Sequence, residues 1–204
     1  MSSGQQTTAE RGRPRAFDAT AALDRAIEVF WRHGYEGASL GALTDAMRIN
    51  RPSMYAAFGN KEQLFQAAVH RYAENDMAYA REALAQPTAR AVAESFLLAN
   101  AAAVTRPDRP PGCLSIQGGT AAAPASESIA TFLASSRLAG ETALADRFRR
   151  AAEEGDLPPG TDVAALARFV MALSEGHAVH AAAGVPREQL EASARIALAV
   201  FPEA

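Results

Sequence analysis

The chain has 204 residues, a net charge of −3 at pH 7, and 49% hydrophobic residues. This length suffices for one or two domains with a buried core, and no apolar stretch is long enough to cross a membrane. The single cysteine, Cys113, excludes an internal disulfide framework, and the first residues lack the pattern of a secretory leader. We therefore expect a cytoplasmic protein without a membrane partner.

The composition favours an all-α fold. Alanine, leucine, arginine and glutamate are abundant and are good helix formers, whereas alternating β-branched residues are hard to find. Residues 1–71 carry nine Lys and Arg against seven Asp and Glu, and residues 72–204 carry eleven against sixteen. The basic charge therefore gathers at the front, where residues 1–16 resemble a flexible basic arm. Such an arm is either a solvated tail or a DNA contact.

The first two predicted helices begin at capping residues. Asp18 can cap a helix whose apolar residues recur at spacings of three and four, and Gly34 is the expected left-handed stop. Ser39 can cap a second, short helix that ends near Arg48.

The next two predicted helices follow a tight turn. Asn50 can cap a short third helix, where Pro52 is tolerated because first-turn amides have no helical partner. Asn60 and Gln63 have the spacing of a capping box, which opens a longer helix predicted to end at Pro87.

The remainder of the chain reads as further helices with two irregular stretches. The predicted helices cover residues 88–105, 126–154, 162–183 and 186–201. The irregular stretches cover residues 106–124 and 155–161, and both are rich in proline and glycine. Neither stretch has the context of a phosphate-binding loop.

Two short helices joined by a three-residue turn, with longer helices on both sides, form a helix-turn-helix arrangement. The N-terminal part of the second short helix would meet base edges in the major groove. There Arg51 can donate two hydrogen bonds to guanine, and Ser53 can pair with several bases. Tyr55 and Lys61 would bind phosphates.

The segment "SLGALTDAMRINRPSMYAAFGNKEQLF" resembles the DNA-binding signature of the TetR-like, or tetracycline-repressor, family of bacterial transcription regulators. The resemblance extends from Asp18 to Tyr72 and implies a base-reading face on the third helix. "GRPR" resembles the arm that some members lay in the minor groove. The expected DNA-binding residues are Arg13, Arg15, Ser39, Arg48, Arg51, Pro52, Ser53, Tyr55, Ala56, Ala57 and Lys61.

One position departs from the family pattern. The family commonly has glycine in the turn before the recognition helix, whereas this chain has Arg48. A left-handed backbone there would cost roughly 1–2 kcal/mol for a residue other than glycine. Either the turn differs slightly, or Arg48 offsets the cost by reaching a phosphate.

The resemblance also implies a homodimer that binds a palindromic DNA operator and responds to a small-molecule effector. The expected organisation is an arm at residues 1–16, a three-helix head at 17–62, and a helical effector-binding and dimerisation domain at 63–204. The candidate pocket residues are Phe96, Leu114, Ile116, Phe132, Phe169, Leu173 and His177, although apolar residues at helical spacing more often form ordinary core.

Other chemistry receives less support. His177 and His180 could hold a metal with Cys113 or Glu175, but no second clustered ligand pair exists, so we expect no metal and no cofactor. Cys113 reads as a packed residue or as a sensing thiol. An enzyme would need Cys113 or Ser115 with His177 as base, without a recognisable motif. A protein-interaction module with a vestigial head is the remaining alternative.

Overall fold

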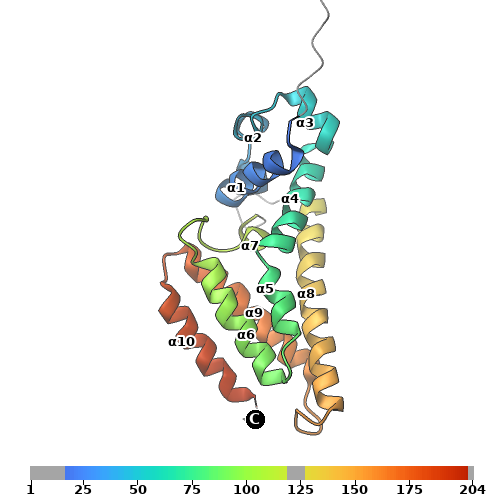
Figure 1. The fold of residues 1–204 in the computed structure, drawn as a ribbon, viewed down its shortest axis with the longest axis vertical. Coiled ribbons are helices and arrows are strands. Elements are labelled where there is room, and N and C mark those ends of the chain that lie inside the picture. The colour runs from blue at the N-terminus through green and yellow to red at the C-terminus, as the bar shows by residue number, and fades with distance from the viewer. Residues whose placement is uncertain (1–16, 119–126, 202–204) are drawn as a thin grey trace, which may run out of the picture.

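A computed structural model describes residues 17–118 and 127–201, and within these ranges the chain is helical with no strand, which confirms the predicted all-α fold (Figure 1). The ten helices of these ranges lie in an upper head and a lower body. They are α1 (Ala19–Gly37), α2 (Leu40–Met47), α3 (Arg51–Phe58), α4 (Lys61–Asn75), α5 (Ala78–Leu84), α6 (Ala89–Val104), α7 (Leu114–Gln117), α8 (Glu127–Glu153), α9 (Val163–Ala182) and α10 (Arg187–Ala197). A 3₁₀ turn, Leu198–Val200, follows α10.

Side-chain caps fix where the head helices begin, as the sequence predicts. The Asp18 carboxylate accepts hydrogen bonds from the Thr20 and Ala21 amides, and the Ser39 hydroxyl accepts one from the Ala42 amide. Each cap satisfies amides that have no partner within the helix. The backbone at Gly34 is left-handed with φ 68°, so the regular part of α1 stops there.

Caps also join α3 to α4. The Asn50 side chain accepts a hydrogen bond of 2.8 Å from the Ser53 amide. Asn60 and Gln63 form the predicted capping box, with side-chain to backbone bonds of 2.8 and 3.0 Å. The recognition helix is therefore held between two defined turns.

The prediction of one helix from residue 61 to Pro87 is wrong. The helix breaks after α4, and α5 starts at Ala78. The Tyr72 carbonyl accepts from both the Asp76 and the Met77 amides, at 2.8 and 3.3 Å, so the regular helical pattern ends at this point. Neither glycine nor proline occurs there, and we attribute the break to tertiary contacts of Asp76.

The predicted irregular stretch at 106–124 contains the short helix α7. Leu114 begins it and is fully buried, which anchors this segment in the core beneath the head. Residues 119–126 lie outside the described residues. At the C-terminus, α10 is shorter than predicted because its last turn tightens into the 3₁₀ form.

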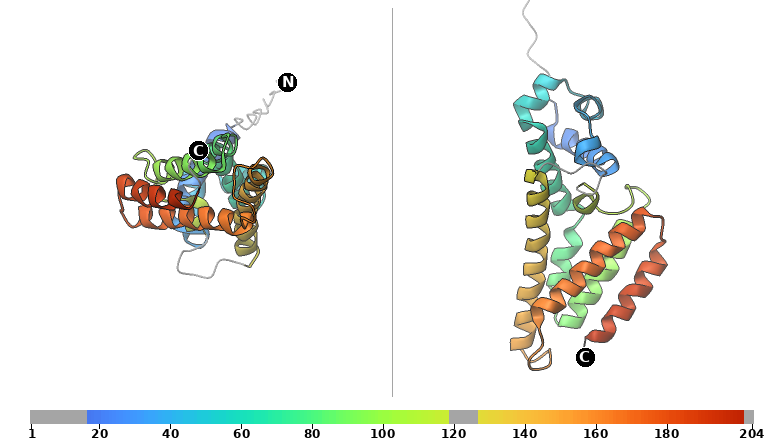
Figure 2. Two further views of the ribbon diagram at one scale, coloured as in Figure 1. Left: turned by 90° about the horizontal axis from the view of Figure 1, so that it is seen from below. Right: turned by 180° about the vertical axis from the view of Figure 1, so that it is seen from behind.

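The body is a bundle in which α6 lies beside α9 and α10, while the long helix α8 runs along α5 and α9 (Figures 1 and 2). The hydrophobic core under the head includes Phe30 and Phe65 together with Leu114 and Ile129 from the body. One apolar core cluster thus includes residues of both the head and the adjoining part of the body. The predicted division at residues 62 and 63 stays a prediction. No described helix is long and apolar enough to cross a membrane.

Candidate DNA-reading surface and effector cavity

The outer face of α3 carries most of the residues that the sequence predicts for base reading. Arg51, Pro52, Tyr55, Ala56 and Ala57 are exposed on α3, and Ser53 is partly exposed. Met54 is fully buried and Phe58 packs against Phe17, with ring centroids 6.4 Å apart, so the inner face of the helix is fixed. The exposed face thus combines one guanidinium with small side chains that permit close approach to a surface.

The turn before α3 contains the one non-glycine residue with positive φ among the described residues. Arg48 has φ 58° and ψ 39°, which is the left-handed conformation anticipated for this position. The Arg48 and Ile49 amides donate to the Asp45 and Thr44 carbonyls, at 3.1 Å each. These bonds close the end of α2 and help to offset the backbone strain. The Arg48 side chain is exposed.

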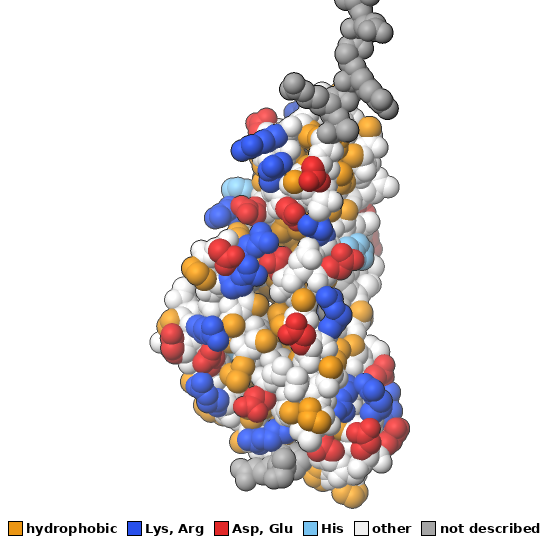
Figure 3. Space-filling view, in the orientation of Figure 1, with side chains coloured by type: hydrophobic (Ala, Val, Ile, Leu, Met, Phe, Trp, Pro, Cys, Tyr) orange, Lys and Arg blue, Asp and Glu red, His pale blue; other side chains and the backbone are white. Residues whose placement is uncertain are grey.

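Ser39 is exposed at the start of α2, where its hydroxyl already serves as the helix cap. Arg13 and Arg15 of the predicted arm lie outside the described residues. Basic and acidic side chains are intermixed over the face shown in Figure 3, on the head as on the body.

Lys61 opens α4, and the structure places its ammonium 4.5 Å from the centroid of the Tyr35 ring. This cation–π contact holds a flexible side chain in one place. Partial burial lowers the pKa of Lys61, and the nearby Glu36 carboxylate acts in the opposite direction. Lys61 is also the first residue of α4, and the N-terminal end of a helix favours an anion.

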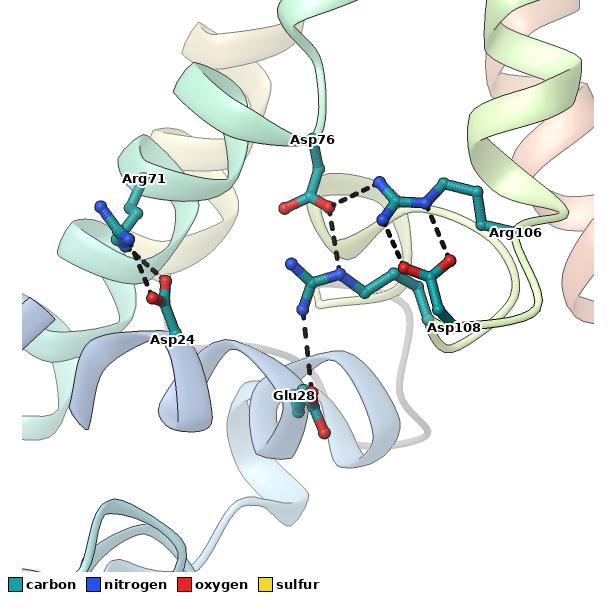
Figure 4. A network of polar contacts seen from close by, with 7 residues as sticks. Asp24, Glu28, Arg71, Asp76, Arg106 and Asp108 are labelled. Atoms are coloured by element: carbon teal, nitrogen blue, oxygen red, sulfur yellow. Dashed lines mark hydrogen bonds and ion pairs between the residues drawn. The ribbon is translucent and has the colours of Figure 1, made fainter. Parts of the chain in front are cut away.

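A polar network lies where the head meets the body (Figure 4). Arg106 and Arg109, from the segment between α6 and α7, each lie 3.3 Å from the Asp76 carboxylate. Arg109 also approaches Glu28 of α1, at 3.7 Å. The network therefore connects the break after α4 with both the head and the body.

A second contact spans the head. Arg71 of α4 makes a two-point contact with Asp24 of α1, with one hydrogen bond of 2.8 Å between Nη2 and Oδ2. The hydrogen bond from Arg71 is the main reason that the pKa of Asp24 is lowered. Because α4 makes this contact and ends next to Asp76, it connects the head to the body.

A cavity of about 280 Å³ lies in the body, below the head. Helices α4 to α9 all contribute to its mainly apolar wall, and Phe96 and Ile116 are the two predicted pocket residues that line it. The wall also includes Tyr72, Met77, Tyr79, Arg81, Asn100, Cys113, Arg137, Ala143 and Glu175.

The other five predicted pocket residues do not line this cavity. Leu114 is fully buried in the core, and Phe132 packs its ring against His70. Phe169 is exposed on α9. Leu173 is partly buried and packs against the core of the body, the cluster that includes Phe148 and Val170. Helical spacing identifies apolar positions but cannot tell a cavity wall from core or from an outer face.

His177, the fifth of these residues, lies behind the cavity wall in a chain of hydrogen bonds. Its Nδ1 is 3.1 Å from the Asn100 Oδ1, and its Nε2 is 2.9 Å from the Ser193 hydroxyl. Asn100 donates to the Tyr79 hydroxyl at 3.0 Å, so the chain reaches the cavity. The sequence reading missed Tyr79 and Asn100. An asparagine within the apolar run "LLANAAAV" was the available signal, because a buried amide requires partners.

The described residues do not form the metal site or the nucleophile–base pair that the sequence left open. His177 is buried while His180 is exposed, and among the described residues no three His, Cys, Asp or Glu side chains are placed to hold a metal. Both ring nitrogens of His177 have partners other than Cys113 and Ser115. Burial raises the pKa of Cys113, whose thiol contacts the Tyr72 hydroxyl.

The chain matches known proteins over nearly its whole length. Residues 22–68 match the model of the bacterial regulatory proteins of the tetR family, and residues 90–197 match the tetracyclin repressor-like C-terminal domain. The HTH-type transcriptional repressor ComR of Escherichia coli (strain K12) is 35% identical over 195 residues, which cover 95% of this chain and 93% of ComR.

Solved structures agree with this assignment. A cysteine mutant of the TetR family transcriptional regulator CifR, complexed with a 26-base-pair operator DNA, is 42% identical with a TM-score of 0.88. The match covers 93% of this chain and 100% of the other. A TetR regulator from Rhodococcus sp. RHA1 is 43% identical, with a TM-score of 0.62 and coverage of 92% and 100%. The chain belongs to the TetR family of bacterial transcriptional regulators.

Proposed function

We propose that this protein is a ligand-responsive repressor that binds a palindromic DNA operator as a homodimer and leaves it when a small molecule enters the cavity. The observation that carries the proposal is the outer face of α3, which is exposed and rests on a buried inner face between two capped turns. A rigid helix with exposed N-terminal side chains is suited to the major groove.

In this role the candidate DNA-binding residues make different kinds of contact with the DNA. Arg51 donates two hydrogen bonds to the O6 and N7 atoms of guanine, and Ser53 adds a less selective contact. Tyr55 and Lys61 bind phosphates, as does Arg48 from the turn. Ala56 and Ala57 allow the helix to approach the base edges. Arg13 and Arg15 extend the contact to the minor groove.

An apolar stripe on the body supports dimer formation. Phe169, Ala172, Gly176 and Val179 follow one another on α9 at spacings of three, four and three, and Phe169 and Val179 are exposed. On α10 the side chain of Ile196 is 77% exposed. Burying this stripe against the same stripe of a second copy would form a four-helix bundle. Two heads roughly 34–36 Å apart would then read two half-sites.

The release step follows from the position of the cavity. Tyr72 and Met77, on either side of the α4–α5 break, line it, and Asp76 lies between them in the chain. A ligand that favours another angle at this break would move α4 and the head attached to it. The resulting change in head separation lowers operator affinity, and operator DNA lowers ligand affinity by the same factor.

The alternative of a protein-interaction module with a vestigial head makes a different prediction. A vestigial head would not select DNA sequences, whereas an exposed Arg51 on a rigid α3 is arranged to do so.

Selection of binding sites from a random DNA pool by the purified protein tests the proposal. An enriched inverted repeat is expected, with half-sites about one helical turn apart. The Arg51→Ala variant, which keeps the fold of α3, serves as the control and should enrich a different or weaker repeat. A folded dimer that enriches no sequence at low salt would contradict the proposal.

A further inference from the structure

Among the polar residues of the cavity wall, Tyr79 is held by a chain of hydrogen bonds that runs through Asn100 to His177. The Tyr79 hydroxyl accepts a hydrogen bond of 3.0 Å from the Asn100 side chain, and both residues line the cavity. Asn100 is 5% exposed and is bonded in turn to His177, which is 2% exposed. The hydroxyl therefore has a fixed place in an otherwise largely apolar wall.

The Tyr79 hydroxyl can form a further hydrogen bond besides the one to Asn100. Burial lowers the pKa of His177, so the imidazole is neutral and carries one proton. If that proton is on Nδ1, it goes to the Asn100 oxygen, the Asn100 amide donates to Tyr79, and the Tyr79 proton is left for the cavity. The Ser193 hydroxyl must then turn its proton from the Leu190 carbonyl to Nε2. If the His177 proton is on Nε2, His177 donates to the Ser193 oxygen. The side-chain oxygen and nitrogen of Asn100 then exchange places, so that Asn100 donates to Nδ1 and Tyr79 donates to Asn100.

In either arrangement Tyr79 presents a hydrogen-bonding group to the cavity. The first arrangement offers a proton and the second offers lone pairs. Burial raises the pKa of Tyr79, so the phenol stays protonated in both. An alcohol, which both donates and accepts, can bond to Tyr79 in either arrangement, whereas a ketone, which only accepts, can bond in the first alone.

The charged residues of the cavity wall do not favour an ionised ligand. Arg137 and Glu175 both line the cavity and are of opposite sign, so their fields largely offset each other. Arg81, also in the wall, keeps its charge, but its side chain is exposed to solvent and donates to the Glu74 carbonyl at 2.9 Å. An ionised ligand would give up its hydration without a matched partner, which is costly.

The volume limits the size of the ligand. A cavity of about 150 Å³ holds benzene. This cavity, at about 280 Å³, is nearly twice as large. It therefore accommodates roughly a dozen non-hydrogen atoms, by extrapolation from that case.

We propose that the cavity binds an uncharged, largely apolar molecule through one oxygen atom, and that Tyr79, oriented by Asn100, is the hydrogen-bonding anchor. The inference names the class of effector and so rests on the proposed function.

The experiment measures the binding of four probes by calorimetry. Benzyl alcohol and acetophenone carry the oxygen, toluene lacks it, and benzoate is charged. Comparing each probe between wild type and Tyr79→Phe isolates the hydroxyl, because differences in probe hydrophobicity cancel. The variant should bind benzyl alcohol about three- to tenfold more weakly and toluene equally well. Acetophenone binding should weaken in the same way only if the Tyr79 proton faces the cavity. Benzoate should bind most weakly to wild type.

Two control variants locate the effect. Tyr72→Phe removes a hydroxyl from the same cavity, but that hydroxyl is engaged by Cys113, so probe binding should hardly change. Ala143→Leu places extra volume in the α8 wall and should weaken all uncharged probes alike. Melting curves of each variant verify that it is folded.

Three outcomes would overturn the inference. They are an equal weakening of toluene and benzyl alcohol binding in Tyr79→Phe, tighter binding of benzoate than of benzyl alcohol, and no binding of any probe to folded wild type. Operator binding by the same preparations is measured separately without probes. A protein that binds the probes as expected but selects no DNA would refute the regulator role and leave the anchor intact.

Discussion

The ammonium of Lys61 lies over the ring of Tyr35, 4.5 Å from its centroid, at the start of the helix that follows the recognition helix. Tyr35 in turn packs against Phe65, with ring centroids 5.3 Å apart, so the contact is anchored in the core of the head. A lysine held in this way keeps its charge near the N-terminal end of α4 at little further cost in side-chain entropy.

For this reason we expect Lys61→Ala to weaken binding to all DNA sequences alike. Removal of a phosphate-binding charge should lessen the slope of log affinity against log salt by about 0.9 for each phosphate that is no longer neutralised. Fluorescence anisotropy on the selected operator and on a scrambled duplex, each at several salt concentrations, measures this. A stronger weakening on the operator than on the scrambled duplex would argue against a purely backbone contact.

Arg51→Ala should behave differently. Removal of a two-point contact to guanine should cost about 1–3 kcal/mol on the operator and abolish the preference at one base pair of each half-site. Binding of the wild type and the variant to operators altered one base at a time identifies that base pair. If the preference stays intact at every position, Arg51 does not read a base.

Arg48→Gly should stabilise the protein, because glycine adopts the left-handed backbone of this turn without steric cost. We expect a gain of roughly 0.5–1 kcal/mol, after the greater unfolded-chain entropy of glycine is subtracted. Arg48→Val, which places a β-branched residue at positive φ, should destabilise the protein. Urea denaturation gives both values, and identical midpoints for the two variants would show that the turn relaxes.

Asp76→Asn should destabilise the junction between head and body. The carboxylate is nearly buried and faces two guanidinium groups, of Arg106 and Arg109. Since both arginines are partly exposed, we expect a modest destabilisation of about 1–2 kcal/mol. Asp108→Asn is a suitable control because that carboxylate is exposed and its ion pair is with Arg106. Thermal unfolding compares the two, and equal melting temperatures would contradict a structural role for Asp76.

Stability should fall on mild acidification because of His177. Burial lowers its pKa in the folded state from the ordinary value of 6.5, with a smaller contribution from His180. Between the two values the unfolded chain binds more protons, so the free energy of unfolding decreases as pH falls through about 6.5. The decrease levels off below the folded pKa.

Urea denaturation between pH 7.5 and about 5 measures this dependence. His177→Gln should flatten the curve in the upper part of that range, whereas His180→Gln, at an exposed position, should leave it nearly unchanged. An unchanged curve for His177→Gln would mean that other groups carry the pH dependence.

Local signals accounted for much of the head. The caps at Asp18, Ser39, Asn50 and Asn60 predicted where four helices begin, because each cap satisfies amides within its own turn. The exposure of Arg51 followed from the burial of Met54 by helical periodicity. The same reasoning failed at the break after α4, where Asp76 is held by arginines thirty or more residues away in the chain.

The all-helical class, the helix-turn-helix arrangement and the outward-facing residues of the recognition helix could all be predicted from the residues alone, since caps and periodicity act over a few positions. The place of the cavity depended on the packed fold. Phe96 and Ile116 line it, whereas Phe169 and Leu173 do not, although all four are apolar residues on helices. The hydrogen bonds that connect Tyr79, Asn100 and His177 also depended on the packed fold. These residues come from three different helices, and packing between helices, not spacing along one, brings their side chains within hydrogen-bonding distance.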